Sequence, residues 1–452
     1  MNSAKRLYKV FAVAAALAVI AILPGRSAFA ITSFARQTGL PCSACHTMPP
    51  ELTPFGRAFK LNGYTLTGLP QLTAKPAQQR SGLTVARELP VSIEIPFSFT
   101  ATSTAVPGTQ NGSFSIPQEI GLFFSGAVSS HAGTFTQITY DPRADHISLD
   151  MEDTRYANRT SLGGKDLVYG FDFTTAPTGE DLWNDTPVWG FPWIGSDAAP
   201  GPMAATLLDG TLTDDVGGVG AYAMWNDHLY GDVTVYRTAH LGADQPFDGA
   251  GFPYNIRGTA PYWRAAWQQT MGNNYLEVGT YGMHVVSSPN AVSGPEDTYT
   301  DLAADSQYER ILPSLANDTI SVHTTYIHER SDLLATYAAG SASFTAHDLS
   351  TYRLDGTYHW GNKYGATLGY FKTWGTVDPL LYAQDPVDGS ANGDPGNAGY
   401  TASFSWWPVQ NIEMALQYTG YTTFNGGSTN YDGAGRNASD NNAIYARVWF
   451  IF

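Results

Sequence analysis

The feature that most constrains the fold is an alternation of apolar and polar residues that recurs from residue 91 to residue 452. In the segment 412–419, two sets of alternate positions differ in polarity: Ile412, Met414, Leu416 and Tyr418 against Glu413, Ala415, Gln417 and Thr419. The segments 320–326 and 400–406 show the same pattern. Because successive side chains of a strand point to opposite faces, the pattern predicts strands with one apolar and one polar face. Such strands are typical of a transmembrane β-barrel with lipid outside and a polar lumen.

Turn residues divide this region into about sixteen predicted strands, and short connections alternate with long ones. The short connections are Ser129-Ser130, Asn226-Asp227, Gly272-Asn273, 360–363 and 408–411. The long ones are 105–114, 176–216, 241–259, 287–298, 334–347, 375–397 and 424–440, whereas 141–146 is shorter than the pattern requires. We therefore expect an all-β fold, a 16-stranded antiparallel transmembrane β-barrel with both ends on the short-turn, periplasmic side.

Composition and the last strand support this prediction. Charged residues make up only 14% of the chain, against about 25% in an average soluble domain. The last strand suits a lipid-facing seam that closes the barrel, because one of its faces carries Ile444, Ala446, Val448, Phe450 and Phe452. A soluble β-sandwich is the alternative, but it needs neither alternating loop lengths nor so aromatic a last strand.

The first 30 residues are typical of a secretory signal peptide. A basic start (Lys5, Arg6 and Lys9) precedes an apolar run at 10–23, and Ala28-Phe29-Ala30 is an A-x-A cleavage site. The apolar run is short for a membrane span, although an uncleaved anchor is the alternative. The mature chain then divides into three predicted parts: an N-terminal segment at 31–68, a Pro-rich polar linker at 69–90 and the barrel at 91–452.

The N-terminal segment holds the only two cysteines of the chain, in the sequence Cys42-Ser43-Ala44-Cys45-His46. A C-x-x-C-H motif attaches a c-type haem through two thioethers, and its His becomes an axial ligand of the iron. A disulfide is the alternative in an exported chain. Because the motif uses every cysteine and follows an export signal, we expect Cys42 and Cys45 to hold one covalent haem c. His46 is then the proximal ligand of the iron.

Residues around this motif are candidates for further contacts with the haem. Arg36, Arg57 and Lys60 suit charge-assisted bonds to its propionates, with solvated surface charge as the alternative. Four aromatic residues suit packing around the porphyrin: Phe34, Phe55, Phe59 and Tyr64. The distal ligand is left open. Met48 is two residues from His46, so we expect it on the proximal side. Five other residues can bind the iron only if the barrel brings them to it: Met203, His131, His240, His284 and His323.

The chain is acidic, with a formal net charge of −16. This charge argues against a nucleic-acid partner and favours cations. Two long connections that we expect to be extracellular are rich in carboxylates: Glu180, Asp181, Asp185, Asp209, Asp214 and Asp215, and then Asp378, Asp385, Asp388 and Asp394. Carboxylates suit weak contact with Fe(II) or Ca(II), but no spacing defines a metal site, so ordinary loop charge is the alternative.

The stretch FARQTGLPCSACHTMPPELTPFGRAFKLNGY, from Phe34 to Tyr64, resembles the fused monohaem cytochrome–porins of the bacterial outer membrane. The resemblance lies in FARQTG before the haem motif and PELTPFGRAFK after it, whereas the barrel matches as architecture only. It implies an outer-membrane protein whose haem segment plugs a porin-like barrel. Since the best-known members oxidise iron, it also implies that electrons pass from extracellular Fe(II), or another reductant, to a periplasmic cytochrome or other carrier.

Three functions remain open at this stage. The first is outer-membrane electron transfer with oxidation of extracellular Fe(II). Because the hydrocarbon core is about 30 Å thick, a single haem serves this function only if the reductant approaches the lumen. The second is a porin whose haem segment acts as a gate, or a protein that exchanges electrons with extracellular donors other than iron. The third is a haem peroxidase tethered at the membrane, which requires an open position on the iron.

Overall fold

The computed structural model describes residues 32–67, 89–213, 215–238, 254–289 and 293–452. Several predictions lie outside these residues: the signal peptide at 1–30, nearly all of the linker at 69–90, and parts of the connections at 241–259 and 287–298. The candidates His240 and Asp214 lie outside them too. None of the helices in the described ranges is both long enough and apolar enough to cross a membrane.

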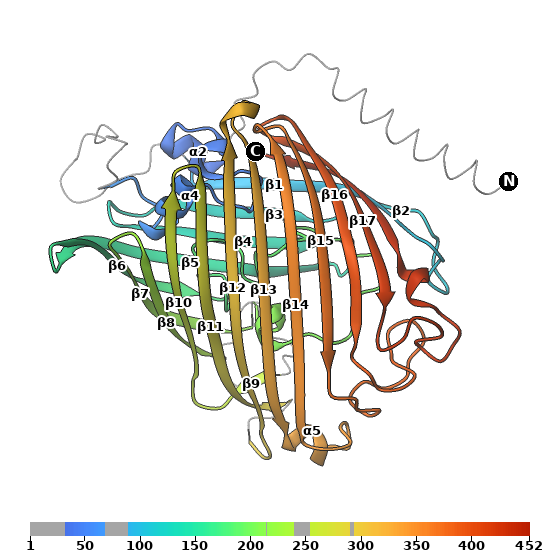
Figure 1. The fold of residues 1–452 in the computed structure, drawn as a ribbon. Coiled ribbons are helices and arrows are strands. Elements are labelled where there is room, and N and C mark those ends of the chain that lie inside the picture. The colour runs from blue at the N-terminus through green and yellow to red at the C-terminus, as the bar shows by residue number, and fades with distance from the viewer. Residues whose placement is uncertain (1–31, 68–88, 214, 239–253, 290–292) are drawn as a thin grey trace.

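The described residues contain one sheet of eighteen strands, which Figure 1 shows as a tall barrel. The strands are β1 (Val91–Thr102), β2 (Ser113–Ser115), β3 (Ile120–Ala127), β4 (Ala132–Asp141), β5 (His146–Leu162), β6 (Lys165–Thr174), β7 (Gly217–Trp225), β8 (Leu229–Arg237), β9 (Tyr254–Ile256), β10 (Ala260–Met271), β11 (Asn274–Pro289), β12 (Asp297–Leu312), β13 (Asp318–Leu333), β14 (Ala346–Trp360), β15 (Tyr364–Gly375), β16 (Asn397–Val409), β17 (Ile412–Thr423) and β18 (Ala443–Ile451). The connections between strands hold the short helices η1 (Leu207–Thr211), η2 (Pro313–Leu315), α5 (Leu334–Ala338) and η3 (Ala438–Asn441).

The barrel is closed, because each long strand pairs antiparallel with the next and β1 pairs with β18. The three-residue strands β2 and β9 are not separate staves of the wall. β2 pairs with β1 beyond the region that β3 covers, and β9 pairs with β11 beyond the region that β10 covers. Sixteen of the eighteen strands therefore form the wall, which confirms the predicted 16-stranded antiparallel barrel.

The two faces of the wall differ in polarity, as the alternation predicts. In β8, Asp232 and Thr234 are buried inside the barrel, whereas Val233 on the outer face is 59% exposed. In β17, Glu413 is buried and Leu416 is 53% exposed. The predicted seam is present as well, because β18 pairs with β1 along its length and the ring centroids of Phe97 and Phe450 lie 5.6 Å apart across it.

Residues 32–67 form a plug inside the barrel, at the end with the short turns (Figure 1). The plug contains the helices α2 (Ser33–Thr38), α3 (Cys42–Cys45) and α4 (Pro54–Leu61). Near its start, Ser33 N donates to Ser92 Oγ of β1 at 2.8 Å. In the motif, Cys42 N donates to Gln410 Oε1, in the short turn between β16 and β17, at 3.1 Å. The two contacts come from residues that are far apart in the sequence but close together around the barrel, because β18 pairs with both β1 and β17.

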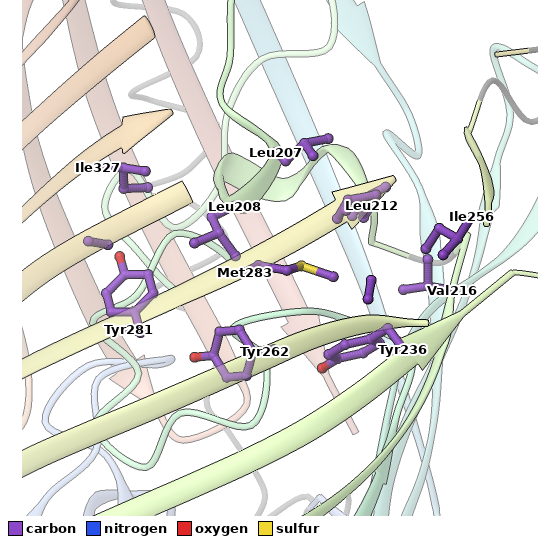
Figure 2. Packing of buried hydrophobic residues seen from close by; sticks show 13 residues of the cluster. Leu207, Leu208, Leu212, Val216, Tyr236, Ile256, Tyr262, Tyr281, Met283 and Ile327 are labelled. Carbon is purple, nitrogen blue, oxygen red and sulfur yellow. The ribbon is translucent and has the colours of Figure 1, made fainter. Parts of the chain in front are cut away.

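The connection between β6 and β7, here called the inner loop (residues 175–216), folds into the lumen. Its apolar side chains pack on inward-facing residues of the wall, as Figure 2 shows for Leu207, Leu208, Leu212 and Val216 against Tyr236, Tyr262, Tyr281 and Met283. The acidic residues Glu180, Asp181 and Asp185 are buried. These three are therefore not ordinary solvated loop charges, which was the alternative for the acidic connections.

The physical reason for the difference lies in the partners that the closed wall offers. Arg264 on β10 forms an ion pair with Asp181, with 2.9 Å between Arg264 Nε and Asp181 Oδ1, and Arg155 on β5 donates from Nη2 to Glu180 O at 2.5 Å. The loop also buries leucines that would otherwise face water, which is favourable by about 1.5–3 kcal/mol for each side chain. In the second acidic connection Asp378 is buried, whereas Asp385 and Asp388 are exposed.

Candidate haem-attachment site

The Cys42–His46 motif is one helical turn that is fixed to the helix after it. Helix α3 carries both cysteines, and His46 N donates to Cys42 O at 3.0 Å. Thr53 connects this turn to α4, since its Oγ1 donates to Ala44 O at 2.6 Å and also accepts a bond from Gly56 N. The second bond makes Thr53 the N-cap of α4.

Gly56 allows α4 to approach the motif closely. A Cβ atom at this position would lie 2.2 Å from Cys45 O, well inside van der Waals contact. The glycine of the PFGR sequence is therefore required by the contact between the two helices.

The ring of His46 is oriented by a backbone carbonyl. Its Nδ1 lies 3.2 Å from Glu51 O, and because a carbonyl oxygen only accepts, Nδ1 carries the proton and Nε2 keeps its lone pair. Burial lowers the pKa of the His46 ring to about 4, although the carbonyls of Glu51 and Pro50 act in the opposite direction. A neutral imidazole whose Nδ1 donates to a carbonyl is the usual form of a metal-binding His.

Both thiols of the motif are free rather than joined in a disulfide, and both are half-buried. Burial, and to a smaller extent Cys42, raises the pKa of the Cys45 thiol to about 11. Because the thiolate is the reactive form, the folded barrel disfavours chemistry at these sulfurs. One turn thus carries two thiols and an imidazole whose Nε2 is available. This set of donors fits a c-type haem.

The four aromatic side chains near the motif pack on one another. The ring centroids of Phe34 and Phe59 are 5.2 Å apart, those of Phe34 and Tyr64 are 5.4 Å apart, and Phe55 stacks on Phe59 at 6.4 Å. Tyr64 also donates from its hydroxyl to Asp153 Oδ2 on β5. This aromatic group forms the small core of the plug, and its contact with a porphyrin stays a prediction.

The three predicted propionate partners all donate to acceptors of the protein. Arg36 Nη2 bonds Leu89 O at 3.0 Å. Arg57 forms a two-pronged ion pair with Glu309 of β12, at 2.5 and 3.3 Å, and its guanidinium lies 4.2 Å from the centroid of the Tyr275 ring. These bonds hold the plug to the wall, and the contact of these cations with a propionate stays a prediction.

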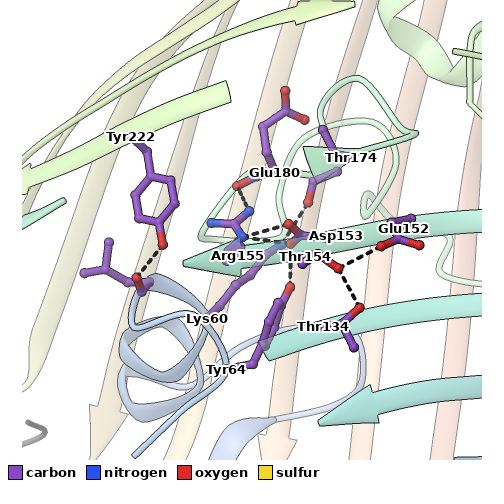
Figure 3. A network of polar contacts seen from close by, with 12 residues as sticks. Lys60, Tyr64, Thr134, Glu152, Asp153, Thr154, Arg155, Thr174, Glu180 and Tyr222 are labelled. Carbon is purple, nitrogen blue, oxygen red and sulfur yellow. Dashed lines mark hydrogen bonds and ion pairs between the residues drawn. The ribbon is translucent and has the colours of Figure 1, made fainter. Parts of the chain in front are cut away.

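Lys60 attaches the plug to the inner loop. Its Nζ donates to Gly179 O, Asp181 O and Asn184 Oδ1 at 2.9, 2.6 and 3.0 Å. Figure 3 shows Lys60 next to a network that includes Tyr64, Asp153, Arg155 and Glu180. The three bonds use all three donors of the ammonium group.

Glu51 is a site residue that the sequence analysis did not single out. Its carboxylate accepts a bond from Ser321 Oγ at 3.0 Å and lies 3.0 Å from His359 Nε2 and 3.8 Å from His323 Nδ1. Burial alone would raise the pKa of Glu51, but the His359 and His323 rings and the Ser321 hydroxyl lower it to about 2. These partners are 270 or more residues away along the chain, so no local signal predicts them.

The structure also places the described candidates for the distal ligand. His284 lies on the outer face of β11, with its Nδ1 2.8 Å from Thr300 Oγ1, and is therefore excluded. His323 faces the lumen, where its Nδ1 lies 3.0 Å from Asp355 Oδ2. Met48 packs on the wall, since a Cβ atom on Gly365 would lie 1.7 Å from Met48 Cε. His131 lies in the short turn between β3 and β4, and Met203 belongs to the inner loop.

The structure is a plugged sixteen-stranded β-barrel whose plug carries two free thiols and an imidazole on one turn. No family model matches the chain, and no curated protein matches it. Among solved structures, the chain is similar to the outer membrane channel DcaP of Acinetobacter baumannii, at 11% identity and a TM-score of 0.46 over 80% of this chain and 96% of that one. It is also similar to the anion-selective porin from Comamonas acidovorans, at 10% identity and a TM-score of 0.45 over 80% and 98% of the two chains. The loop L8 deletion mutant of OmpT, an outer membrane protein of Vibrio cholerae, has 9% identity and a TM-score of 0.43 over 80% and 98%.

Proposed function

We propose that this chain is an outer-membrane electron-transfer protein, in which the plug carries one c-type haem and extracellular Fe(II) is oxidised. The observation that carries the proposal is the position of the Cys42–His46 turn on a plug inside a closed barrel. A haem attached at this place would be surrounded by the barrel wall, with one compartment at each end of the barrel.

The outer face of the barrel supports the location in a membrane. Large apolar side chains are exposed around the wall, including Val219, Val233, Val278, Leu302, Leu368 and Phe404. A soluble protein rarely exposes so large an apolar surface. A closed barrel leaves no unpaired strand edge, which is what hydrocarbon requires of a sheet. Near the short turns the outer face carries aromatic residues of the kind found at membrane interfaces, among them Trp225, Trp267, Trp360 and Tyr364.

The residues of the plug support one covalent haem. Cys42 and Cys45 would hold it by thioethers, and His46 would bind the iron through Nε2 because Glu51 O fixes its Nδ1. Such a group supplies one-electron redox chemistry. The sequence from Phe34 to Tyr64, which resembles the fused monohaem cytochrome–porins, supports the same assignment.

The reaction needs a donor on one side and an acceptor on the other. Each Fe(II) loses one electron and becomes Fe(III), and a periplasmic carrier takes up that electron. The bond from Cys42 N to Gln410, which lies in a short turn, supports this direction, because the short turns are the expected periplasmic side, where the carrier would dock. The long connections lie at the opposite end, and Fe(II) would approach from there.

Stopped-flow mixing of the oxidised full-length protein with Fe(II) tests the proposal. We expect the absorption bands of a ferrous c-type haem to appear on mixing, and we expect no change with Zn(II) at the same concentration. Spectra that stay ferric at saturating Fe(II) would rule out iron oxidation.

The seating of the plug also favours a second candidate, a porin that the plug gates. Arg57, Lys60 and Glu51 fix the plug at three places, each of them a polar contact that a change of charge can weaken. This candidate predicts that ion conductance across a planar bilayer changes with the redox state of the protein. A conductance that is the same in both states counts against it.

A further inference from the structure

Four buried carboxylates surround one guanidinium inside the barrel. Asp181 and Asp185 come from the inner loop, Glu277 from β11 and Asp305 from β12, and none is more than 4% exposed. Arg264 of β10 lies among them, with its Nη2 2.6 Å from Asp305 Oδ2, 3.3 Å from Glu277 Oε1 and 3.5 Å from Asp185 Oδ1. The inner loop thus brings two acids to a wall that already holds two.

The charges in this group do not balance. Among the described residues, Arg264 is the one cation in an ion pair with these four carboxylates. Lys60 lies nearby but bonds the backbone carbonyl of Asp181. Burying an ionised carboxylate is costly unless it is paired, so the excess negative charge requires either protons or another cation.

Unpartnered oxygens point to a cation. Asp185 Oδ2 and Glu277 Oε2 are buried and have no hydrogen-bond partner. One oxygen from each of Asp185, Glu277 and Asp305 lies within 4.8 Å of the other two. Oxygens bound to one cation at about 2.3–2.6 Å are no more than about 5 Å apart, so all three can bind the same ion.

Gly279 on β11 leaves room for two of the three carboxylates, because it has no side chain. A Cβ atom on Gly279 would lie 2.5 Å from Asp305 Oδ1 and 2.7 Å from Glu277 Oε1. Asp185 also borders a cavity of about 20 Å³, whose lining includes His323 and Asp355. A space of this size holds one water molecule, and of the three carboxylates Asp185 alone borders it.

We propose that Asp185, Glu277 and Asp305 form a binding site for one hard divalent cation between the inner loop and the wall. The ligand set consists of carboxylates without thiol or imidazole, which suits Mn(II), Mg(II), Ca(II) or Fe(II) rather than a soft metal ion. The further assignment of Fe(II) as its physiological occupant rests on the proposed function.

Contacts connect this site to the haem motif. The Arg264 guanidinium lies 5.1 Å from the centroid of the Trp183 ring, and Trp183 Nε1 donates to Tyr275 OH at 2.5 Å. Tyr275 packs under Arg57, and Arg57 Nη1 donates to Leu52 O at 2.7 Å. Leu52 pairs with His46 in an isolated β-bridge. A cation at this site would therefore lie at one end of a continuous series of contacts that reaches the predicted iron ligand.

Titration of the full-length protein with Mn(II), followed by electron paramagnetic resonance, tests the site. We expect one bound Mn(II) per barrel. Glu277→Gln removes a ligand charge, and Gly279→Ala fills the space while it leaves every charge in place. We expect each to weaken Mn(II) binding by about tenfold or more, because affinity depends on the number of ligand charges and on the shape of the site. The matched control is Asp232→Asn, which neutralises another buried carboxylate of the wall.

The outcomes separate this site from the proposed function. Absence of bound Mn(II) in the wild-type protein, or equal binding by the wild type and both variants, would overturn the site. If Mn(II) binds as expected but Fe(II) does not reduce the protein, the site stands and iron oxidation fails. If Fe(II) reduces the wild type and both variants at the same rate, the assignment of Fe(II) to this site is wrong and iron oxidation stands.

Discussion

Single residues set how closely the helices of the plug approach one another. At Gly56 the backbone of α4 meets Cys45 O, and Thr53 bonds both helices. The geometry of the haem motif therefore depends on two residues that bind no ligand. A change at either should alter the motif without removing a predicted haem donor.

We expect Gly56→Ala to loosen the contact between α3 and α4, because the new methyl group would lie 2.2 Å from Cys45 O. Overpacking of this kind costs about 1–3 kcal/mol. Hydrogen exchange of the α4 amides, measured by mass spectrometry, should become faster. Gly195→Ala is the control, since no atom lies within 4 Å of the added Cβ. Equal exchange in both variants would contradict the assigned role of Gly56.

The Cys42–His46 turn could be predicted from the sequence because it is local, while the haem that it is expected to hold stays a prediction. Cys42, Cys45 and His46 are neighbours along the chain, and the structure places them on one turn. Arg57 and Lys60 are different, because Glu309 is 252 residues from Arg57 and Asp181 is 121 residues from Lys60. A lone cation in a sequence indicates a need for an acceptor but does not identify it.

At the scale of elements, α4 is fixed to the wall by one ion pair. Arg57 and Glu309 have side chains that are only 6% and 13% exposed. Removing one partner of a buried pair leaves an unpaired charge, which costs about 3–5 kcal/mol. The docking of the plug should therefore be sensitive to either residue.

We expect Arg57→Met to increase hydrogen exchange throughout α4 strongly, because it leaves Glu309 buried without its cation. The double variant Arg57→Met, Glu309→Gln should recover part of the protection. Arg143→Met is the control, since the pair of Arg143 with Asp197 is partly exposed and such pairs contribute about 0–1 kcal/mol. If the α4 amides of the double variant lose more protection than the two single variants lose together, the result would argue against the pair.

Asp378 gathers several polar contacts at the start of the connection at 376–396. Asp378 accepts bonds from Ser343 N at 2.7 Å and Ser343 Oγ at 2.6 Å, and it lies 2.9 Å from His347 Nε2. Burial alone would raise its pKa, but the Ser343 bonds and the Leu381 N–H hold the pKa of Asp378 well below its usual range.

The sign of the resulting pH dependence follows from this pKa. A carboxyl group whose pKa is lower in the folded chain than in the unfolded chain stabilises the fold when the pH is above the unfolded pKa of about 3.9. This stabilisation is lost as the pH falls from there through the folded pKa. We expect Asp378→Asn to make the connection more sensitive to pepsin at pH 4, and the difference from wild type to shrink toward pH 2. A difference that grows as the pH falls would contradict this.

The strands could be predicted from the sequence, whereas the inner loop could not. Alternation marks each strand because each strand has a lipid face and a lumen face. Leu207 and Leu208 carry no such signal, because their partners Tyr281 and Ile327 become neighbours only when the barrel closes. The acids of the inner loop resemble exposed loop charge until Arg264 is placed beside them.

The whole molecule is asymmetric along the barrel axis. The plug lies at the short-turn end and the long connections lie at the opposite end (Figure 1). The inner loop packs on the lumen face of the wall. In the proposed reaction, Fe(III) would stay on the side where Fe(II) arrives. An electron that crosses the barrel would leave on the side of the plug.

Proteoliposomes test the central claim most directly. The full-length protein is inserted with Fe(II) outside and oxidised cytochrome c sealed inside, and the absorbance of the internal cytochrome c is followed. We predict that the internal cytochrome c is reduced while Fe(III) collects outside, and that the Cys42→Ser, Cys45→Ser double variant shows only the leak of empty vesicles. Internal reduction at the leak rate in the wild-type protein would contradict the account.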